Sequence, residues 1–192
     1  VKINYSTLNY KDSLAITSSS PVIKTYPMIP GIDFSGEVEE TSNANFQIGD
    51  KVILNGFGVG EKHWGGMSQK ARVNGKWLVK LPQKFTEKQS MAIGTAGYTA
   101  MLCVMALEKN GITPNKGEII VTGATGGVGS IAISILNKLG YEVCASSGRL
   151  EYNKYLNALG ANRIINRSEL TEKGRPLNKE IWAGAIDSVG SF

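Results

Sequence analysis

The first 82 residues alternate apolar and polar positions over short stretches that are separated by turn residues. Val1, Ile3 and Tyr5 alternate with polar neighbours, which is typical of a half-buried β-strand. Further strands are predicted at residues 37–40, 51–54, 68–73 and 77–81. Many short strands at this spacing predict a small β-barrel or sandwich.

The periodicity changes at Thr86, where helical signals begin. Thr86 and Gln89 have the spacing of a capping box, in which each side chain bonds the backbone of the other residue. Helical segments follow, broken near Gly94 and Gly97. The stretch 98–108 is apolar nearly all round, so we expect a helix that is buried on every side.

Strands and helices alternate from residue 118 onward. Apolar stretches predict strands at residues 118–122, 142–146, 163–166 and 183–189. One helix is predicted from Val128 to Leu139, whose apolar residues fall on one face, and a second at 150–159. This alternation predicts a parallel sheet with helices on both faces. A doubly wound dinucleotide domain normally has about six strands, and four are predicted here, so we expect a fragment that stops early at Phe192. Because Val1 falls inside a predicted strand, we expect the fragment to begin inside the protein as well.

A glycine-rich loop, Gly-Ala-Thr-Gly-Gly-Val-Gly at residues 123–129, joins the first of these strands to the first helix. Glycines let the backbone approach a pyrophosphate, and the amides and dipole at the helix start attract its charge. Ala124 stands where the strict G-x-G-x-x-G pattern has its first glycine, and Gly123 partly compensates. The alternative is a glycine-rich turn without a ligand. We expect a dinucleotide site that uses four residues of this loop: Thr125, Gly126, Gly127 and Val128.

The end of the second strand indicates which dinucleotide binds. NAD enzymes place a carboxylate there, whereas this chain has Ser146-Ser147-Gly148-Arg149 and no carboxylate before Glu151. Serine hydroxyls and an arginine would bind the 2′-phosphate that a carboxylate repels. We therefore predict NADPH, bound by Ser147, Gly148 and Arg149, with Lys154 adding charge one helical turn later. The alternative is a polar loop with an exposed arginine.

Composition narrows the classes of partner. The 192 residues allow one large domain or two small ones, and the net charge of +5 comes from scattered lysines and arginines without a long basic run. We expect no nucleic-acid partner, since a mild positive excess suits a phosphate-rich small molecule equally well. The two cysteines form no Cys-x-x-Cys motif, which favours a reduced, cytoplasmic protein. We find no run of 18 apolar residues and expect no membrane span.

Several motifs together resemble one known family. They are Leu8-Asn9-Tyr10-Lys11-Asp12, Pro-Gly-Ile-Asp-Phe-Ser-Gly at 30–36, His-Trp-Gly-Gly at 63–66, Gly-Thr-Ala-Gly-Tyr-Thr-Ala at 94–100 and Ser147-Gly148-Arg149. The chain resembles the medium-chain dehydrogenase/reductase superfamily and, within it, the quinone-oxidoreductase-like acryloyl-CoA reductase group. The resemblance implies an α/β fold, with a GroES-like β-barrel domain at 1–90 and a truncated doubly wound Rossmann domain at 91–192. It also implies a homodimer for the full-length protein.

The resemblance implies a reductase without metal. Zinc-dependent members use a Gly-His-Glu motif and a cysteine ligand, whereas this chain has Gly31-Ile32-Asp33 at that place. Its only histidine, His63, has no cysteine neighbour, and catalytic zinc needs three protein ligands. We therefore predict no metal site and expect His63 to lie in a loop near the cleft, with a direct catalytic role as the alternative.

Reduction of an activated double bond is the reaction that this resemblance implies. Hydride from NADPH would add to the β-carbon of an enoyl thioester or enone, and a donor would stabilise the charge on the carbonyl oxygen. The resemblance points to Tyr10 as that donor, unless its ring only packs, and Asn9 is a second polar candidate. Asp12 would orient either residue or cap a turn. Thr95 and Thr99 would approach the nicotinamide or only cap a helix.

Three functions remain open at this point. The first is reduction of a short 2-enoyl-CoA such as acryloyl-CoA. The second is an NADPH quinone reductase, with the same coenzyme site and a different substrate pocket. The third, of a different class, is an NADPH-binding protein without catalysis.

Overall fold

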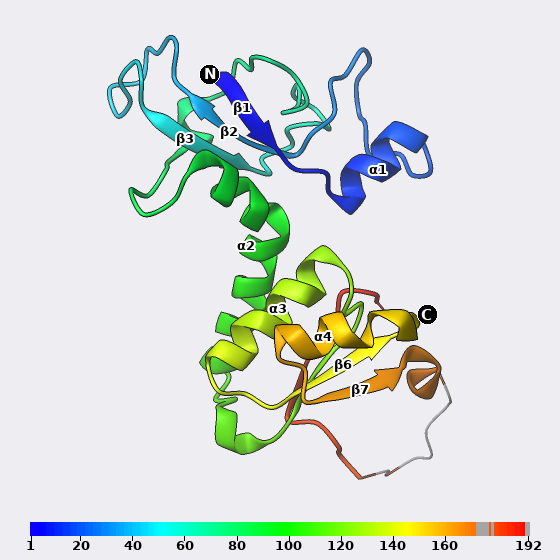
Figure 1. Ribbon diagram of the computed structural model, residues 1–192. Coiled ribbons are helices and arrows are strands. Elements are labelled where there is room, and N and C mark those ends of the chain that lie inside the picture. The colour runs from blue at the N-terminus through cyan, green and yellow to red at the C-terminus, as the bar shows by residue number, and fades with distance from the viewer. Residues whose placement is uncertain (172–176, 178, 191–192) are drawn as a thin grey trace. The chain divides into compact units, whose positions relative to one another are not determined.

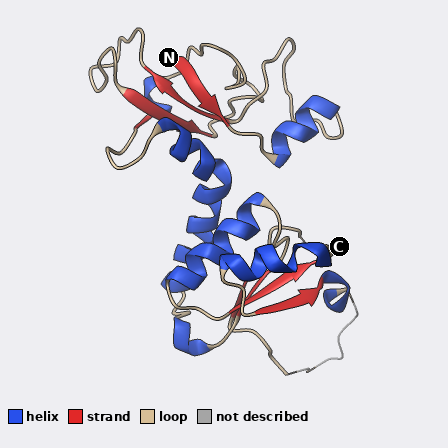
Figure 2. Cartoon of the chain, viewed as in Figure 1, coloured by secondary structure: helices blue, strands red, loops and turns tan. Residues whose placement is uncertain are grey.

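The computed structural model describes residues 1–171, 177 and 179–190, so Phe192 lies outside the described residues. The chain forms two compact units, Val1–Thr95 and Ala96–Phe192, and each is described by itself. The strands are β1 (Lys2–Ser6), β2 (Asp33–Glu37), β3 (Lys51–Asn55), β4 (Val79–Lys80), β5 (Ile119–Val121), β6 (Val143–Ser147), β7 (Arg163–Asn166) and β8 (Gly184–Ile186). The α-helices are α1 (Tyr10–Thr17), α2 (Glu87–Lys109), α3 (Gly127–Lys138) and α4 (Asn153–Leu159), joined by the short 3-10 turns η1 (Gly75–Trp77), η2 (Pro114–Lys116), η3 (Leu150–Tyr152) and η4 (Arg167–Leu170) (Figure 2).

The first unit contains an antiparallel sheet with the strand order β1-β2-β3-β4. Phe34 of β2 lies opposite Leu54 of β3, and both side chains are fully buried with Val59 and Ala71. The outer edge of β1 bonds residues 69–71, which form only an isolated bridge where we expected a strand. The strand that we predicted at residues 51–54 is confirmed as β3. The strand that we predicted at residues 68–73 is wrong.

Strand β2 lies earlier in the chain than predicted, at Asp33–Glu37 instead of residues 37–40. The pattern was obscured because Asp33 and Ser35, two polar residues of this strand, are completely buried. Both side chains have hydrogen-bond partners, which removes the usual penalty for burying a polar group.

Helix α1 was not predicted, although its capping signal is present in the sequence. Asn9 is the N-cap residue, and its N–H donates to the Asp12 carboxylate over 2.8 Å. The spacing Asn9-x-x-Asp12 is that of a capping box, which could have revealed the helix. Ser18 ends the helix in the left-handed conformation.

Helix α2 begins with the predicted capping box and breaks at Gly94. The Thr86 N–H donates to Gln89 Oε1 over 2.9 Å, and the Gln89 N–H donates to Thr86 Oγ1 over 3.2 Å, which confirms the prediction. Gly94 has φ 52° and ψ −161°, a conformation that interrupts the helix. Only glycine adopts such angles without strain.

The expectation that residues 98–108 are buried on every side is wrong. Ala100 and Val104 are fully buried, but four apolar residues of the same helix are 40–56% exposed: Tyr98, Met101, Leu102 and Met105. By length and composition alone, α2 is also a helix that could cross a membrane, a feature that our search for an unbroken apolar run missed. This is weak evidence, since the break at Gly94 leaves residues 95–109 as the longest regular part, whereas a span needs about 20 residues.

The second unit contains a parallel sheet with the order β7-β6-β5-β8, and the predicted strands and helices of this region are confirmed. Helices α3 and α4 lie side by side over one face of the sheet (Figure 1). We expected helices on both faces, but in the described residues α2, α3 and α4 all pack on this one face. On the other face Trp182 covers Ile120, Cys144 and Ile165. Both crossovers, β5-α3-β6 and β6-α4-β7, run in the same direction, so right-handed connections place both helices on the same face.

Candidate functional site

The glycine-rich loop lies between β5 and α3, as the motif requires. Gly126 is the N-cap residue of α3 and has no side chain to accept from the first amides of the helix. These amides and the helix dipole therefore favour an anion. A Cβ on Gly129 would lie 2.4 Å from the Gly123 carbonyl oxygen and 2.8 Å from Ala124 Cα. Only glycine permits this close packing of helix against strand, which is the role of the last glycine in dinucleotide-binding loops.

A pocket of about 380 Å³ opens beside this loop and combines hydroxyl, guanidinium and aromatic groups. Its lining residues are Thr125, Arg149, Tyr152 and Tyr155. The Arg149 guanidinium lies 6.0 Å from the centre of the Tyr152 ring, within the range of a cation–π interaction. The pocket thus offers positive charge for a phosphate and ring surface for a base.

Three further residues of the predicted coenzyme site differ in their placement. Ser147 is buried at the end of β6, and its hydroxyl accepts from the Arg149 N–H over 3.0 Å, so it shapes the turn that presents the arginine. Gly148 follows it at the turn. Lys154 is exposed on α4 and does not line the pocket.

Arg167 lies against the same turn at Gly148, and the sequence analysis did not predict it as a site residue. It directly follows β7, and a Cβ on Gly148 would lie 2.7 Å from its Nε atom and 3.2 Å from Cζ. The guanidinium therefore rests against the backbone of the turn that carries Arg149. The signal was available, since parallel neighbours end at the same sheet edge and Ser147 pairs with Asn166.

The segment after β8 approaches the other side of the loop. A Cβ on Gly123 would lie 2.4 Å from Ser188 Oγ, and the Ser188 N–H donates to Thr122 Oγ1 over 3.1 Å. The Thr122 hydroxyl also donates to Asp187, which lowers the pKa of that carboxyl, and the amides of Val189 and Gly190 act in the same sense. These groups lie at the carboxyl ends of β5 and β8, where the strand order reverses and ligands bind in open α/β sheets.

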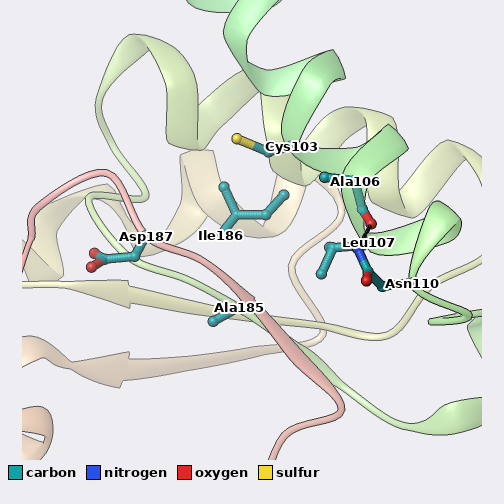
Figure 3. Close-up of a pocket in the computed structure, with 7 residues that line it drawn as sticks. All are labelled: Cys103, Ala106, Leu107, Asn110, Ala185, Ile186 and Asp187. Carbon is teal, nitrogen blue, oxygen red and sulfur yellow. Dashed lines mark hydrogen bonds between the residues drawn. The ribbon is translucent and has the colours of Figure 1, made fainter.

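A second pocket, also of about 380 Å³, lies between α2 and β8 (Figure 3). Its lining residues are Cys103, Ala106, Leu107, Asn110, Ala185, Ile186 and Asp187. The side-chain amide of Asn110 donates to the Ala106 carbonyl over 2.8 Å. The walls are mostly apolar and carry no basic group. This pocket therefore does not suit a phosphate.

The three predicted catalytic residues lie together at the start of α1 but differ in exposure. Tyr10 is 80% exposed, so its ring is not packed within the first unit. Asp12 is 1% exposed, and its carboxylate accepts from the N–H groups of Asn9, Gly31 and Ile32 over 2.8, 3.1 and 3.0 Å. Asp12 thus caps α1 and fixes it to the loop before β2, which corresponds to the capping alternative rather than a contact with Tyr10.

The side chains of Asn9 and Thr95 both donate to the carboxylate of Asp33, which the sequence analysis did not predict as a site residue. Its Oδ2 atom accepts from Thr95 N–H over 2.9 Å, Thr95 Oγ1 over 2.8 Å and Asn9 Nδ2 over 3.1 Å. Thr99 is half-buried on the next turn of α2. The sequence distance of 62 residues between Asp33 and Thr95 explains why no local pattern indicated this contact.

His63 packs against aromatic rings in the loop after β3. Its ring centre lies 4.7 Å from that of Trp77, which stacks on Phe57 at 5.7 Å. The part of the chain that the structure describes contains no group of three or more His, Cys, Asp and Glu residues that could hold a metal ion.

Comparison with known proteins gives consistent results for both units. Residues 1–83 match the family of alcohol dehydrogenase GroES-like domains. The chain is 56% identical over 190 residues to the probable acrylyl-CoA reductase AcuI of Escherichia coli K12, which covers 99% of this chain and 58% of that protein. It is 47% identical over 191 residues to the putative quinone oxidoreductase YhfP of Bacillus subtilis, with 99% and 58% covered. The chain thus spans somewhat more than half the length of these relatives.

A solved structure extends this similarity to the backbone. The crystal structure of the yhdH oxidoreductase of Salmonella enterica in complex with NADP matches with a TM-score of 0.97 at 56% identity, over 100% of this chain and 59% of that one. The predicted fold class is confirmed: an α/β chain with a GroES-like domain followed by a Rossmann-like parallel sheet. On these findings the chain is similar, over nearly all of its length, to quinone-oxidoreductase-like and acrylyl-CoA reductase proteins of the medium-chain dehydrogenase/reductase superfamily.

Proposed function

We propose that this chain is the greater part of an NADPH-dependent reductase that acts on an activated carbon–carbon double bond, with a short 2-enoyl-CoA such as acryloyl-CoA as its substrate. The observation that carries the proposal is the pair Arg149 and Arg167 at the ends of β6 and β7, where β6 ends in Ser146-Ser147-Gly148 and not in a carboxylate that would repel the 2′-phosphate. Similarity to AcuI supports the choice of substrate class.

The described residues fit NADPH. The close approach at Gly129 lets the loop cradle a pyrophosphate, and the first amides of α3 point their charge toward it. Thr125, Gly126, Gly127 and Val128 would hold the pyrophosphate, while Arg149, Arg167 and the turn at Gly148 would hold the 2′-phosphate. When bound, NADPH supplies the hydride that adds to the β-carbon of the substrate.

In the first unit, Tyr10 would act as a hydrogen-bond donor. Hydride addition to an enoyl thioester moves charge onto the carbonyl oxygen, and a hydroxyl directed at that oxygen stabilises the resulting enolate. Tyr10 is suited to this task because its side chain is 80% exposed and its backbone is fixed by the capped start of α1. Asn9 is a second polar group at the same place, whereas Asp12 would stabilise the helix start without touching the substrate.

The experiment measures coenzyme binding first and oxidation of the coenzyme by the substrate second. The full protein, as its gene encodes it, is titrated with NADPH and NADH, and the absorbance of the reduced coenzyme is followed after acryloyl-CoA is added. We expect tighter binding of NADPH and rapid oxidation. Tyr10→Phe should lower kcat by about 100-fold, since removing one oxyanion donor typically has an effect of that order. NADPH binding without oxidation of any activated alkene would contradict the proposal.

A quinone reductase is the second candidate, because the chain is also similar to YhfP, named a putative quinone oxidoreductase. The two candidates share the coenzyme site and differ in substrate. Steady-state rates with acryloyl-CoA and with a soluble quinone separate them, since kcat/KM should favour the true substrate by a large factor.

We further propose that the complete protein is a cytoplasmic homodimer. The two cysteines are free thiols, which suits a reducing compartment. The homodimer is what the resemblance to the medium-chain dehydrogenase/reductase superfamily implies for the complete protein. Light scattering on the full protein gives the mass, and a monomer at micromolar concentration would contradict the dimer.

A further inference from the structure

Gly148 directly follows β6, and the residue beside it at the end of β7 is Arg167. Ser147, the last residue of β6, pairs with Asn166, so Gly148 and Arg167 leave the sheet side by side. A Cβ built on Gly148 would lie 2.7, 3.0 and 3.2 Å from the Nε, Cδ and Cζ atoms of Arg167. The space that a larger residue would need at position 148 is therefore occupied by the end of the arginine side chain.

The backbone of Gly148 does not itself require glycine. Its φ lies outside the range of +20° to +160° in which residues with a Cβ are strained. The three nearest atoms that a Cβ would meet belong to a flexible side chain, whereas at Gly129 they belong to the backbone. An alanine at position 148 would therefore displace the Arg167 side chain, whose Nε atom would move from 2.7 Å to at least 3.4 Å, the shortest ordinary contact.

The backbone of Arg167 is fixed by the capping box of η4. The Asn166 N–H donates to Glu169 Oε1 over 2.9 Å, and the Ser168 N–H donates to Asn166 Oδ1 over 2.9 Å. Arg167 is the first residue of this short helix and lies between the two capped residues. The position of its guanidinium therefore depends on its side-chain dihedral angles and on the space left at Gly148.

Neither arginine at this turn takes part in a salt bridge among the described residues. By contrast Arg163, at the other end of β7, forms a salt bridge with Glu118. Arg149 and Arg167 thus bring two positive charges to one turn without a carboxylate partner. Such an arrangement favours an anion, and the 2′-phosphate of NADPH is the anion that the proposed function supplies.

We infer that Gly148 is a specificity-determining residue for NADPH, because its missing Cβ leaves the space from which the Arg167 guanidinium binds the 2′-phosphate. This inference rests on the proposed function for its coenzyme. In the sheet order β7-β6-β5, the turn at Gly148 lies between Arg167 after β7 and the glycine-rich loop after β5. Arg149 lines the pocket with Thr125 of that loop, and Arg167 supplies charge from the β7 side. A side chain at position 148 would reduce the contact with the 2′-phosphate and leave the loop that holds the pyrophosphate intact.

The test is Gly148→Ala, alone and combined with Arg167→Ala, in the full protein as its gene encodes it. Fluorescence titration with NADPH and with NADH gives both Kd values. We expect Gly148→Ala to raise the Kd for NADPH by about 10-fold, the lower end of the effect of one charge-assisted hydrogen bond, and to leave the Kd for NADH unchanged. When Arg167 is already alanine, the added Cβ has no guanidinium to displace, so Gly148→Ala should have no further effect. Arg163→Ala is the matched control, since it removes an arginine from the other end of the same strand, and it should change neither Kd.

Two outcomes of the titration would overturn the inference. If Gly148→Ala weakens NADPH binding equally with and without Arg167, glycine is needed for the approach of the coenzyme to the backbone and not for the arginine. If Gly148→Ala leaves the preference for NADPH over NADH unchanged, the space at Gly148 does not determine specificity.

Melting temperatures keep the test decisive if Gly148→Ala folds poorly. Because the three nearest atoms to the added Cβ belong to Arg167, the double variant should melt at the temperature of Arg167→Ala alone. A double variant that stays destabilised would contradict the inference. The titrations need no turnover, so a wild type that prefers NADPH but reduces neither acryloyl-CoA nor a quinone contradicts the proposed function alone. A wild type without a preference for NADPH contradicts both.

Discussion

Replacing Arg149 or Arg167 by alanine should weaken the binding of NADPH and leave the binding of NADH unchanged. Both guanidinium groups lie where β6 and β7 end, one lining the pocket with Thr125 and the other resting against Gly148. The coenzymes differ only in the 2′-phosphate, so groups that contact it discriminate between them.

The size of the effect follows from the chemistry of the two groups. A hydrogen bond to a charged partner contributes about 1.5–3 kcal/mol, so each substitution should raise the Kd for NADPH by about 10- to 150-fold. The cation–π contact of Arg149 with Tyr152 contributes about 0.5–1 kcal/mol at an exposed site, which is too little to account for an effect of this size. Because both arginines serve one phosphate, we expect the double variant to lose less than the sum of the single effects.

The assay is a fluorescence titration of each variant with NADPH and with NADH at the same ionic strength. Arg72→Ala is the matched control, since it removes an exposed arginine of the first unit and the same formal charge. A variant that binds both coenzymes equally weakly would show that the arginines support the loop rather than the 2′-phosphate. Unchanged NADPH affinity in both single variants would refute the assignment of the site.

Three further predictions concern stability. Gly129→Ala places a Cβ 2.4 Å from the Gly123 carbonyl oxygen, so urea denaturation should show a loss of about 1–3 kcal/mol, and NADPH binding should weaken with it. Thr86→Ala removes the N-cap of α2 and should lower the free energy of unfolding by about 1 kcal/mol in the same measurement. The pKa of Asp187 is lowered, chiefly by the Thr122 hydroxyl, so its stabilisation is present above the ordinary value of 3.8 and is lost as the pH falls through the lowered pKa. The stability difference between wild type and Asp187→Asn should therefore shrink in acid, and a difference that grows below pH 3.8 would contradict this sign.

The second unit was predicted well because its signals are local. Each of its strands contains a short apolar run, and a glycine follows each of the helices α3 and α4. Gly160, for example, caps α4 in the left-handed conformation with φ 104°, as expected for a helix-terminating glycine. The coenzyme loop was also predicted because strand, glycines and helix follow one another directly in the chain.

The apolar pattern of α2 led to a wrong expectation for a different reason. An apolar side chain is buried only where another segment of the chain covers it. Ala100 and Val104 pack against the sheet of the second unit, whereas Met101 and Met105 on the same helix remain 40% and 52% exposed among the described residues. Periodicity therefore predicts helical structure and the preferred face, and it does not state how many faces have partners.

Asp33 and Ser35 show why the first unit was harder to interpret. A polar residue at an inward position of a strand breaks the alternation that predicts the strand, so β2 was placed four residues too late. The same residue is nevertheless informative, because burial of a carboxylate without partners is too unfavourable to persist. An acidic residue inside a short apolar stretch, such as Ile32-Asp33-Phe34, therefore indicates that donors converge on it from elsewhere in the fold. The sequence can predict that such donors exist, whereas their identity depends on contacts over 24 to 62 residues, which only the folded chain defines.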